Sequence, residues 1–259
     1  MSKRARRFVL LFACLGLAGV SCKKAGRASL ATIPAAKLVD AQAAGVIVVL
    51  GSSTAAGTGP STPQNAWVER YRAYLGVAFP KFRLINLAVG GYTTYQMQAT
   101  DYAPPSNRPK PDANHDITKA LSFEPNAIII NMPSNDQASR FPLPEQLANY
   151  ERVSALGARK GVLFWVSTTQ PRNFADAADR RELMSARDAI KQKFGDHTLD
   201  FWSPFAEADG RIDASYDSGD GTHLNDAAHA LLVEQVIRAK IPEAIVSALH
   251  AADHAQEQR

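Results

Sequence analysis

Apolar residues along the chain alternate between short, mainly apolar runs and longer stretches in which they recur every three or four positions. A short apolar run is typical of a strand buried on both faces, and the spaced pattern is typical of an amphipathic helix. Strands that alternate with helices in this way predict an α/β fold with a parallel sheet. The predicted strands cover residues 46–50, 82–87, 127–130, 162–166 and 198–202.

Amphipathic helices are predicted between and after these strands. Asn225 is a suitable N-cap for a helix over 226–240, and a last helix is predicted over 242–253. The proline-rich segment 101–114 is predicted to be a loop within the domain. Three earlier helical stripes are formed by Trp67, Tyr71 and Leu75, by Leu147, Tyr150 and Ser154, and by Leu183, Ala186, Ile190 and Phe194.

These elements fit a single domain with three α/β/α layers, in which helices cover both faces of a five-stranded parallel sheet. A chain of 259 residues is long enough for one sizeable core of this kind. The domain is predicted to extend over residues 45–255. The aromatic residues Trp165, Phe201 and Trp202 are expected in its core rather than on a binding surface.

The N-terminus has the pattern of an export signal. Basic residues precede an almost wholly apolar stretch over 8–20, which is short for a membrane span and typical of a signal peptide. Cys22 stands where a bacterial lipoprotein leader is cut and its cysteine acylated, although Gly19 replaces the usual leucine. We therefore expect a leader over 1–22, a tether over 23–44, and an exported protein that is periplasmic or anchored by a lipid on Cys22. An ordinary cleavable leader with an incidental cysteine is the alternative.

The distribution of charge removes the apparent basic character of the chain. The formal net charge is +4, but four basic residues lie in the leader, and the remaining 25 basic residues balance 25 acidic ones. This balance does not indicate a nucleic-acid partner. Apart from His223, the histidines are not spaced as metal ligands, so no metal site is expected.

Three polar motifs lie where nucleophilic catalysis needs them. Ser53 follows the first strand, Asn135 follows the third, and Asp220 precedes His223 by three positions. A hydroxyl, a base and an orienting carboxylate are the three parts of a serine hydrolase, and an asparagine amide can stabilise an oxyanion. Ligands bind beyond the carboxyl ends of the strands in a parallel sheet, so Ser53, Gly91 and Asn135 are expected to converge there.

Each motif also has a purely structural interpretation. Ser53 and Asn135 are common residue types in turns after strands, and His223 can be a surface histidine. The run from Gly51 to Thr58 does not form a phosphate loop, because it has one residue too many between its glycines and no lysine before the threonine. The catalytic interpretation is favoured because the motifs occur together.

The motifs resemble those of the SGNH hydrolases, or GDSL esterases, in which serine, glycine, asparagine and histidine occur in four separated blocks in that order. The resemblance extends over roughly residues 45–240. Ser52 stands where this family usually has an aspartate, and Pro133 stands where it usually has a glycine. These departures concern subfamily and substrate more than chemistry. The blocks read Gly51-Ser52-Ser53, Asn86-Leu87-Ala88-Val89-Gly90-Gly91, Pro133-Ser134-Asn135-Asp136 and Asp220-Gly221-Thr222-His223.

The resemblance implies a flavodoxin-like fold, a catalytic site and no cofactor. Ser53 is then the nucleophile, His223 the general base and Asp220 the acid that orients it. The oxyanion hole would consist of the backbone N–H groups of Ser53 and Gly91 and the side-chain amide of Asn135. Gly90 is the alternative to Gly91.

The expected function is an exported serine esterase that acts on short acyl esters, such as the acetyl groups of a carbohydrate. No inserted helical lid is apparent between the blocks to supply an apolar acyl tunnel. Arg172 and Asn173 follow the fourth strand and are candidate substrate contacts. A lysophospholipase, thioesterase or acyltransferase is an alternative within the family, and a catalytically inactive, glycan-binding surface lipoprotein is an alternative of another class. The sequence leaves the ester and the oligomeric state open.

Overall fold

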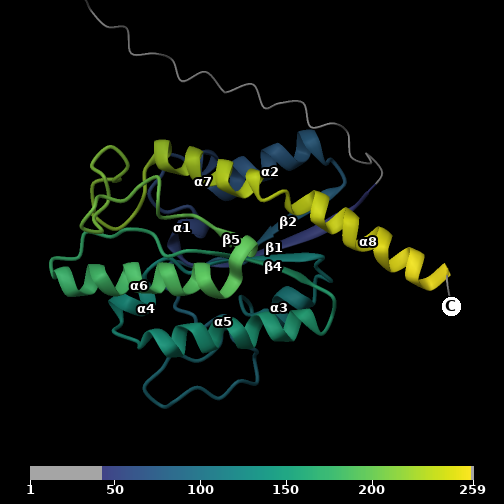
Figure 1. Cartoon of the computed structure of the whole chain (residues 1–259), viewed down its shortest axis with the longest axis horizontal. Helices are drawn as coiled ribbons and strands as arrows, with labels where there is room; N and C mark the ends of the chain where they lie inside the picture. The colour runs from purple at the N-terminus through teal and green to yellow at the C-terminus, as the bar shows by residue number, and fades with distance from the viewer. Residues whose placement is uncertain (1–42, 258–259) are drawn as a thin grey trace, which may run out of the picture. The chain divides into compact units, whose positions relative to one another are not determined.

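The computed structural model describes residues 43–257. The predicted leader, Cys22 and all but the last two residues of the predicted tether lie outside the described residues. Within them, five parallel strands form one sheet in the order β2-β1-β3-β4-β5 (Figure 1). The strands are β1 (Gly45–Gly51), β2 (Phe82–Asn86), β3 (Ala127–Asn131), β4 (Leu163–Ser167) and β5 (Thr198–Leu199).

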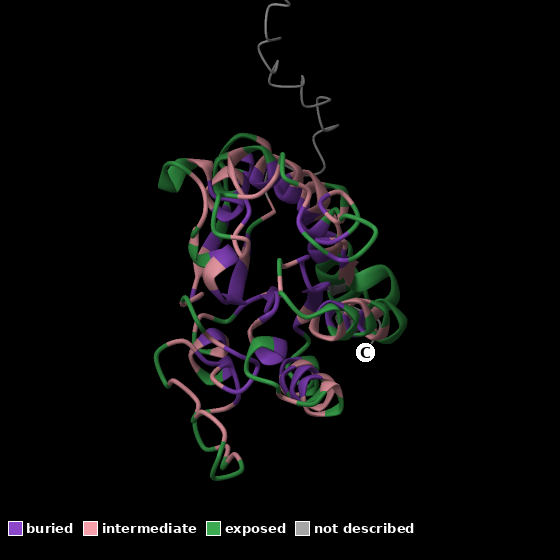
Figure 2. Cartoon of the chain, turned by 90° about the vertical axis from the view of Figure 1, so that its left-hand side faces the viewer, coloured by how far each residue is buried: buried purple, intermediate pink, exposed green. Residues whose placement is uncertain are grey.

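Helices lie on both faces of this sheet, which confirms the predicted α/β/α architecture (Figure 1). Figure 2 shows buried residues on the helix surfaces that face the interior and exposed residues on the outer surfaces. The helices are α1 (Ser53–Ala56), α2 (Trp67–Ala78), α3 (Ile117–Leu121), α4 (Asn135–Ala138), α5 (Leu143–Ala158), α6 (Ala177–Phe194), α7 (Asp226–Arg238) and α8 (Ile241–Glu257), with short 3-10 turns η1 (Pro63–Asn65) and η2 (Gly195–His197).

The sheet separates two apolar cores. Along β1, Ile47 and Val49 pack into the core formed with α2, α7 and α8, whereas Val48 and Leu50 pack into the core formed with α3 and α5. Successive side chains of a strand point to opposite faces, so a strand between two helical layers has to be apolar at every position. This explains the unbroken apolar run that predicted the strand. Trp165, Phe201 and Trp202 are buried, as expected.

The last strand is shorter than predicted. β5 ends at Leu199, whereas the apolar pattern continues to Trp202. The carboxylate of Asp200 accepts hydrogen bonds from the backbone N–H groups of Trp202 at 3.0 Å and Ser203 at 2.9 Å. These bonds turn the chain out of the strand, because an aspartate side chain competes with the ladder for nearby backbone donors.

Three helix predictions need adjustment, and the predicted N-cap is confirmed. The buried face of α5 contains Tyr150 and Val153, whereas Ser154 of the predicted stripe is only partly buried. α8 continues to Glu257, beyond the predicted end at residue 253. Asn225 caps α7 as predicted, because its side chain accepts hydrogen bonds from the first N–H groups of that helix, but α7 ends at Arg238 and not at the predicted residue 240.

The segment 101–114 is a loop, as predicted, and it projects from the body of the domain below α5 in Figure 1. Arg108 in this loop forms a two-pronged ion pair with Glu145 of α5, with N–O distances of 2.7 and 2.9 Å. The described part of the chain has no helix that is both long enough and apolar enough to cross a bilayer.

Candidate active site

Ser53 is the first residue of α1 and follows the carboxyl end of β1, from which Ser52 separates it. The junction between β1 and α1 is anchored by Ser52, which is buried and whose N–H donates to the carbonyl of Asn131 at the end of β3, at 3.0 Å. Ser53 is partly exposed. The sequence therefore folds so that a hydroxyl emerges at the edge of the sheet where ligands bind in parallel α/β proteins.

The hydroxyl of Ser53 is linked through His223 to Asp220. Ser53 Oγ lies 3.0 Å from His223 Nε2, and His223 Nδ1 lies 2.6 Å from Asp220 Oδ2. A neutral imidazole with its proton on Nδ1 donates to Asp220 and leaves Nε2 to accept the proton of the hydroxyl. The structure thus brings together three predicted residues that are up to 170 positions apart, in an arrangement that can remove a proton from a nucleophile.

Asp220 is held in its ionised form. Partial burial favours the protonated acid, but hydrogen bonds from the His223 ring and from the N–H groups of His223 and Thr222 outweigh this effect and hold the pKa of Asp220 well below its ordinary value. The two backbone donors lie 2.8 and 2.9 Å from Oδ1. The carboxylate therefore keeps its negative charge beside the imidazole throughout the neutral range.

Gln170 connects the two halves of this site. Its side-chain oxygen accepts a hydrogen bond from Thr54 Oγ1 at 2.8 Å, and its amide donates to the carbonyl of Thr222 at 2.9 Å. Gln170 is fully buried and bridges α1 to the loop before His223. Gln170 was not among the residues predicted from the sequence. Its signal was a polar residue shortly after the fourth apolar run, the same kind of position that singled out Ser53 and Asn135.

Gly59 allows two loops of the site to pack closely. Its φ is +110°, a backbone conformation that favours glycine. A Cβ atom at Gly59 would lie 2.2 Å from the carbonyl oxygen of Leu224 and 3.1 Å from the Cβ of His223. Only glycine permits this approach, so the loop after α1 supports the segment that carries His223.

The three predicted oxyanion donors come from the ends of three strands. Asn135 begins α4 after β3, and Gly91 lies after β2 with a φ of +85°, in the left-handed region. A Cβ atom at Gly90 would lie 3.9 Å from the Cβ of Ser53, which places this glycine beside the start of α1. Among the described residues, no backbone partner accepts a hydrogen bond from the N–H of Ser53, Gly90 or Gly91. The choice between the two glycines stays a prediction.

The amide of Asn135 is already engaged. Its Nδ2 lies 2.7 Å from Ser52 Oγ and 3.0 Å from the carbonyl oxygen of Tyr92, so both of its N–H bonds have acceptors. Ser52, the residue that replaces the family's usual aspartate, therefore orients the asparagine. This replacement was predicted to concern subfamily and substrate more than chemistry, and the contact with Asn135 was not predicted.

A buried polar network fixes the loop that carries the glycines. The carboxyl of Asp136 accepts hydrogen bonds from the N–H of Thr94 at 3.1 Å and from its hydroxyl at 2.6 Å, and Asn149 of α5 donates to the same hydroxyl at 2.9 Å. Burial raises the pKa of Asp136 to about 6, against the opposing effect of the Thr94 hydrogen bonds. Asp136 follows Asn135 directly, so the network ties α4 to the loop after β2.

The two predicted substrate contacts differ in their surroundings. Asn173 has its side-chain oxygen bonded to the N–H of Ile212 at 2.8 Å and its amide bonded to Asp217 at 2.9 Å. These contacts brace the loop before Asp220, and they use the groups that a substrate would need. Arg172 is half-buried and lies next to the site, with Nη1 3.4 Å from Ser134 Oγ.

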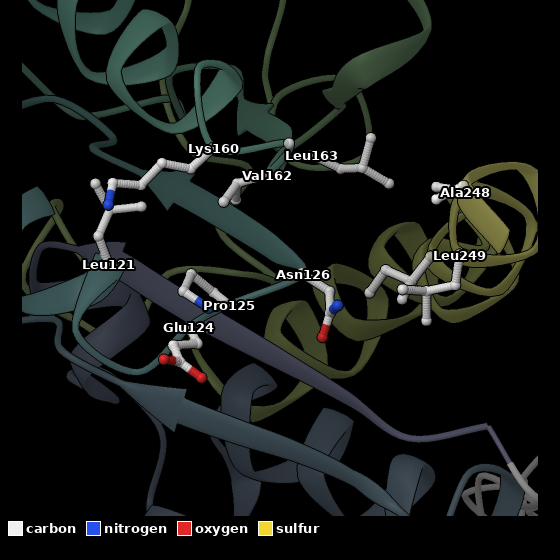
Figure 3. Close-up of a pocket in the computed structure, with 12 residues that line it drawn as sticks. Leu121, Glu124, Pro125, Asn126, Lys160, Val162, Leu163, Ala248 and Leu249 are labelled. Carbon is white, nitrogen blue, oxygen red and sulfur yellow. The ribbon is translucent and has the colours of Figure 1, made fainter. Parts of the chain in front are cut away.

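A hollow of about 440 Å³ lies at the opposite edge of the sheet, where β3 and β4 begin (Figure 3). Asn126 and Leu163 line it from the sheet side, and Ala248 and Leu249 line it from α8. Its lining contains none of the predicted site residues. Within the described residues, no group of three or more His, Cys, Asp or Glu side chains is arranged to hold a metal ion.

Comparisons with known proteins show the family of the chain. A family model described as the GDSL-like lipase/acylhydrolase family matches residues 49–231. No curated protein matches the chain by sequence.

Solved structures share the fold at low sequence identity. The psychrotrophic esterase EstA from Pseudoalteromonas sp. has a TM-score of 0.54 and 17% identity, over 75% of this chain and 96% of that one. A carbohydrate acetylesterase family member from Sinorhizobium meliloti has a TM-score of 0.54 and 14% identity, over 78% and 99%. A two-domain esterase active on acetylated mannans has a TM-score of 0.51 and 17% identity, over 79% and 49%.

Proposed function

The chain belongs to the GDSL-like lipase/acylhydrolase family and is a serine hydrolase, and on this premise we propose that it hydrolyses short-chain carboxylic esters with Ser53 as nucleophile, His223 as general base and Asp220 as the acid that orients it. The observation that carries this proposal is the continuous hydrogen-bonded chain from Ser53 Oγ through both nitrogens of His223 to Asp220. A glycan-binding protein without activity has no need for this alignment.

The geometry accommodates a two-step reaction. Ser53 Oγ attacks the ester carbonyl while His223 Nε2 takes its proton, and the ionised Asp220 stabilises the imidazolium. The carbon–oxygen bond to the alcohol then breaks, and His223 returns the proton to the departing alcohol. Water attacks the acyl group on Ser53 with His223 again as base, which releases the acid and restores the hydroxyl.

The negative oxygen formed in each step needs donors that are already in place. We assign this role to the N–H groups of Ser53 and Gly91 and to the amide of Asn135. Because both N–H bonds of Asn135 have acceptors, the amide has to redirect one of them towards the oxyanion. The bond to Tyr92, at 3.0 Å, is the longer of the two, so we propose that it is given up while Ser52 keeps the amide in position.

Short acyl groups are proposed because the described residues that follow the strands offer no evident source of apolar lining for a long acyl chain. The connection between β1 and α2 contains only the short helix α1 and the turn η1, and the long loop 101–114 is rich in proline and polar residues. An acetylated carbohydrate is the proposed substrate class. Two structural neighbours support it, since one is described as a carbohydrate acetylesterase family member and another as active on acetylated mannans.

Hydrolysis of aryl esters from acetyl to palmitoyl tests the acyl preference. A site that buries the acyl chain gains about 0.8 kcal/mol per methylene, which is roughly a fourfold rise in kcat/KM for each added carbon. We expect kcat/KM to be highest for acetyl to butyryl esters and to fall for longer chains. A steady rise towards palmitoyl would favour a lysophospholipase or thioesterase instead, and transfer of the acetyl group to an added sugar in preference to water would indicate an acyltransferase.

Export and anchoring through Cys22 also remain proposals. Mass spectrometry of the protein recovered from its native envelope is expected to show a diacylglyceryl group on Cys22 as the first residue. An unmodified Cys22, or cleavage at another residue, would end this proposal without affecting the catalytic one.

A further inference from the structure

Arg172 carries a positive charge that the described part of the chain does not neutralise by contact. A guanidinium has five N–H donors, yet the hydrogen bond from Nη1 to Ser134 Oγ, at 3.4 Å, is a long one. No carboxylate among the described residues forms an ion pair with Arg172. The group also lies over the ring of Phe174, 4.7 Å from its centre. Partial burial lowers the pKa of Arg172, and the nearby charge of Asp220 acts against this effect.

Other buried or half-buried arginines in the protein are better satisfied. Arg180 is bonded to the carbonyl oxygens of Phe174, Ala175 and Asp209. Arg108 has its two-pronged ion pair with Glu145. A half-buried cation without such partners costs free energy of desolvation, and only the ring of Phe174 and the more distant charge of Asp220 act against that cost at Arg172. Arg172 is therefore unusual within this fold.

Arg172 also lies between the two parts of the candidate site. Ser134, which it contacts, is buried and directly precedes Asn135. On the other side, the N–H of Asn173 donates to the carbonyl of Gly221 at 2.8 Å, and Gly221 directly follows Asp220. A group bound to the guanidinium would therefore lie beside the ester that Ser53 attacks.

Resting on the proposed ester hydrolysis, we infer that Arg172 binds an anionic group of the substrate, a carboxylate or a phosphate carried by the portion that contains the ester. The planar guanidinium presents parallel N–H bonds that match two oxygens of either anion. Contact with the ring of Phe174 helps to hold this group in place. The bound anion supplies the partner that the protein itself lacks, and neutral esters leave Arg172 unpaired.

The two sources of such an anion are an acidic sugar and a phosphorylated one. Three acetyl esters that differ in one group separate them: an acetylated hexose, the corresponding hexuronate and the corresponding hexose 6-phosphate. The measurement is kcat/KM for acetate release at pH 7 and low salt, for the wild type, Arg172→Gln, Arg172→Lys and Arg159→Gln. Arg159 is exposed at the end of α5 and serves as the matched control.

The wild type is expected to prefer one of the anionic esters over the neutral one. Hydrogen bonds to a charged group predict that Arg172→Gln lowers this ratio by about ten- to hundredfold, with Arg172→Lys in between. Arg159→Gln should retain the wild-type ratio. A preference for the hexuronate identifies a carboxylate, and a preference for the hexose phosphate identifies a phosphate. No preference in the wild type, or the same ratio in Arg172→Gln, would overturn the inference, while continued hydrolysis of the neutral ester would leave the proposed function intact.

A binding measurement keeps the inference testable if these sugars are not turned over. Calorimetric titration of the Ser53→Ala protein with free hexuronate and hexose 6-phosphate should show binding of one of them. The same titration of a Ser53→Ala, Arg172→Gln protein should show at least tenfold weaker binding, because the loss of one hydrogen bond to a charged group weakens affinity by about this factor. Equal binding by the two proteins, or no binding by either, would refute the role of Arg172 and not that of Ser53.

Discussion

The buried carboxyl of Asp136 makes a defined prediction about stability and pH. Burial raises its pKa from 3.8 to about 6 in the folded protein. The folded state therefore holds the proton more tightly than the unfolded state, so the free energy of unfolding falls as pH rises from about 4 to about 6 and is then constant with respect to this group. The difference of two pKa units corresponds to roughly 3 kcal/mol.

Asp136→Asn removes this dependence with little change in shape. An asparagine keeps one oxygen to accept from the N–H and hydroxyl of Thr94, but it does not ionise. We subtract the unfolding free energy of the wild type from that of the variant at each pH. This difference should be larger at pH 7.5 than at pH 4, by roughly 3 kcal/mol. Asp101→Asn, in the exposed projecting loop, serves as the control.

Urea unfolding followed by circular dichroism at pH 4, 5, 6 and 7.5 measures this difference. The reasoning predicts that the wild type and Asp136→Asn converge or cross as the pH is lowered, with most of the change between pH 4 and 6. A difference that is the same at all four pH values would refute it. So would a variant that becomes relatively less stable as the pH rises.

Three further substitutions test the supports of the site. Asn135→Ala should lower kcat by about 10²- to 10³-fold, because an oxyanion donor acts in the transition state; a change in KM alone would make Asn135 a substrate contact. Ser52→Ala should lower kcat by about three- to tenfold through the loss of one hydrogen bond that orients Asn135. In an Asn135→Ala background the same change should have little effect on kcat, and an equal loss in both backgrounds would contradict this coupling. Gln170→Leu should lower the free energy of unfolding by about 1 to 3 kcal/mol, because it leaves the buried hydroxyl of Thr54 without its acceptor and the partly exposed carbonyl of Thr222 without its donor. Unchanged urea unfolding would show that the bridge contributes little.

The fold could be predicted from local patterns in those segments where burial alone determines which residue types occur. The apolar run of β1 predicted a strand covered on both faces, and Asn225 predicted the start of α7 through a contact within its own first turn. The end of β5 was not predicted, because the side chain of Asp200 turns the backbone there through hydrogen bonds that hydrophobic periodicity does not report.

The same distinction applies to the site. Ser53, Asp220 and His223 were identified because their residue types carry a specific chemistry, and the structure brings them within hydrogen-bond distance. Gln170 was missed because its bond to Thr54 joins residues 116 positions apart, and a lone glutamine after a strand has no characteristic chemistry.

The most direct test of the central claim is covalent labelling of the nucleophile. The folded wild-type protein is treated with a fluorophosphonate, and the modified residue is located by mass spectrometry of its peptides. We predict one adduct per molecule, on Ser53, with none on Ser53→Ala and a rate at least a hundredfold lower for His223→Asn, because the hydroxyl then lacks its base. A folded wild-type protein that stays unlabelled, or one that is labelled at another residue while Ser53 remains free, would contradict the account.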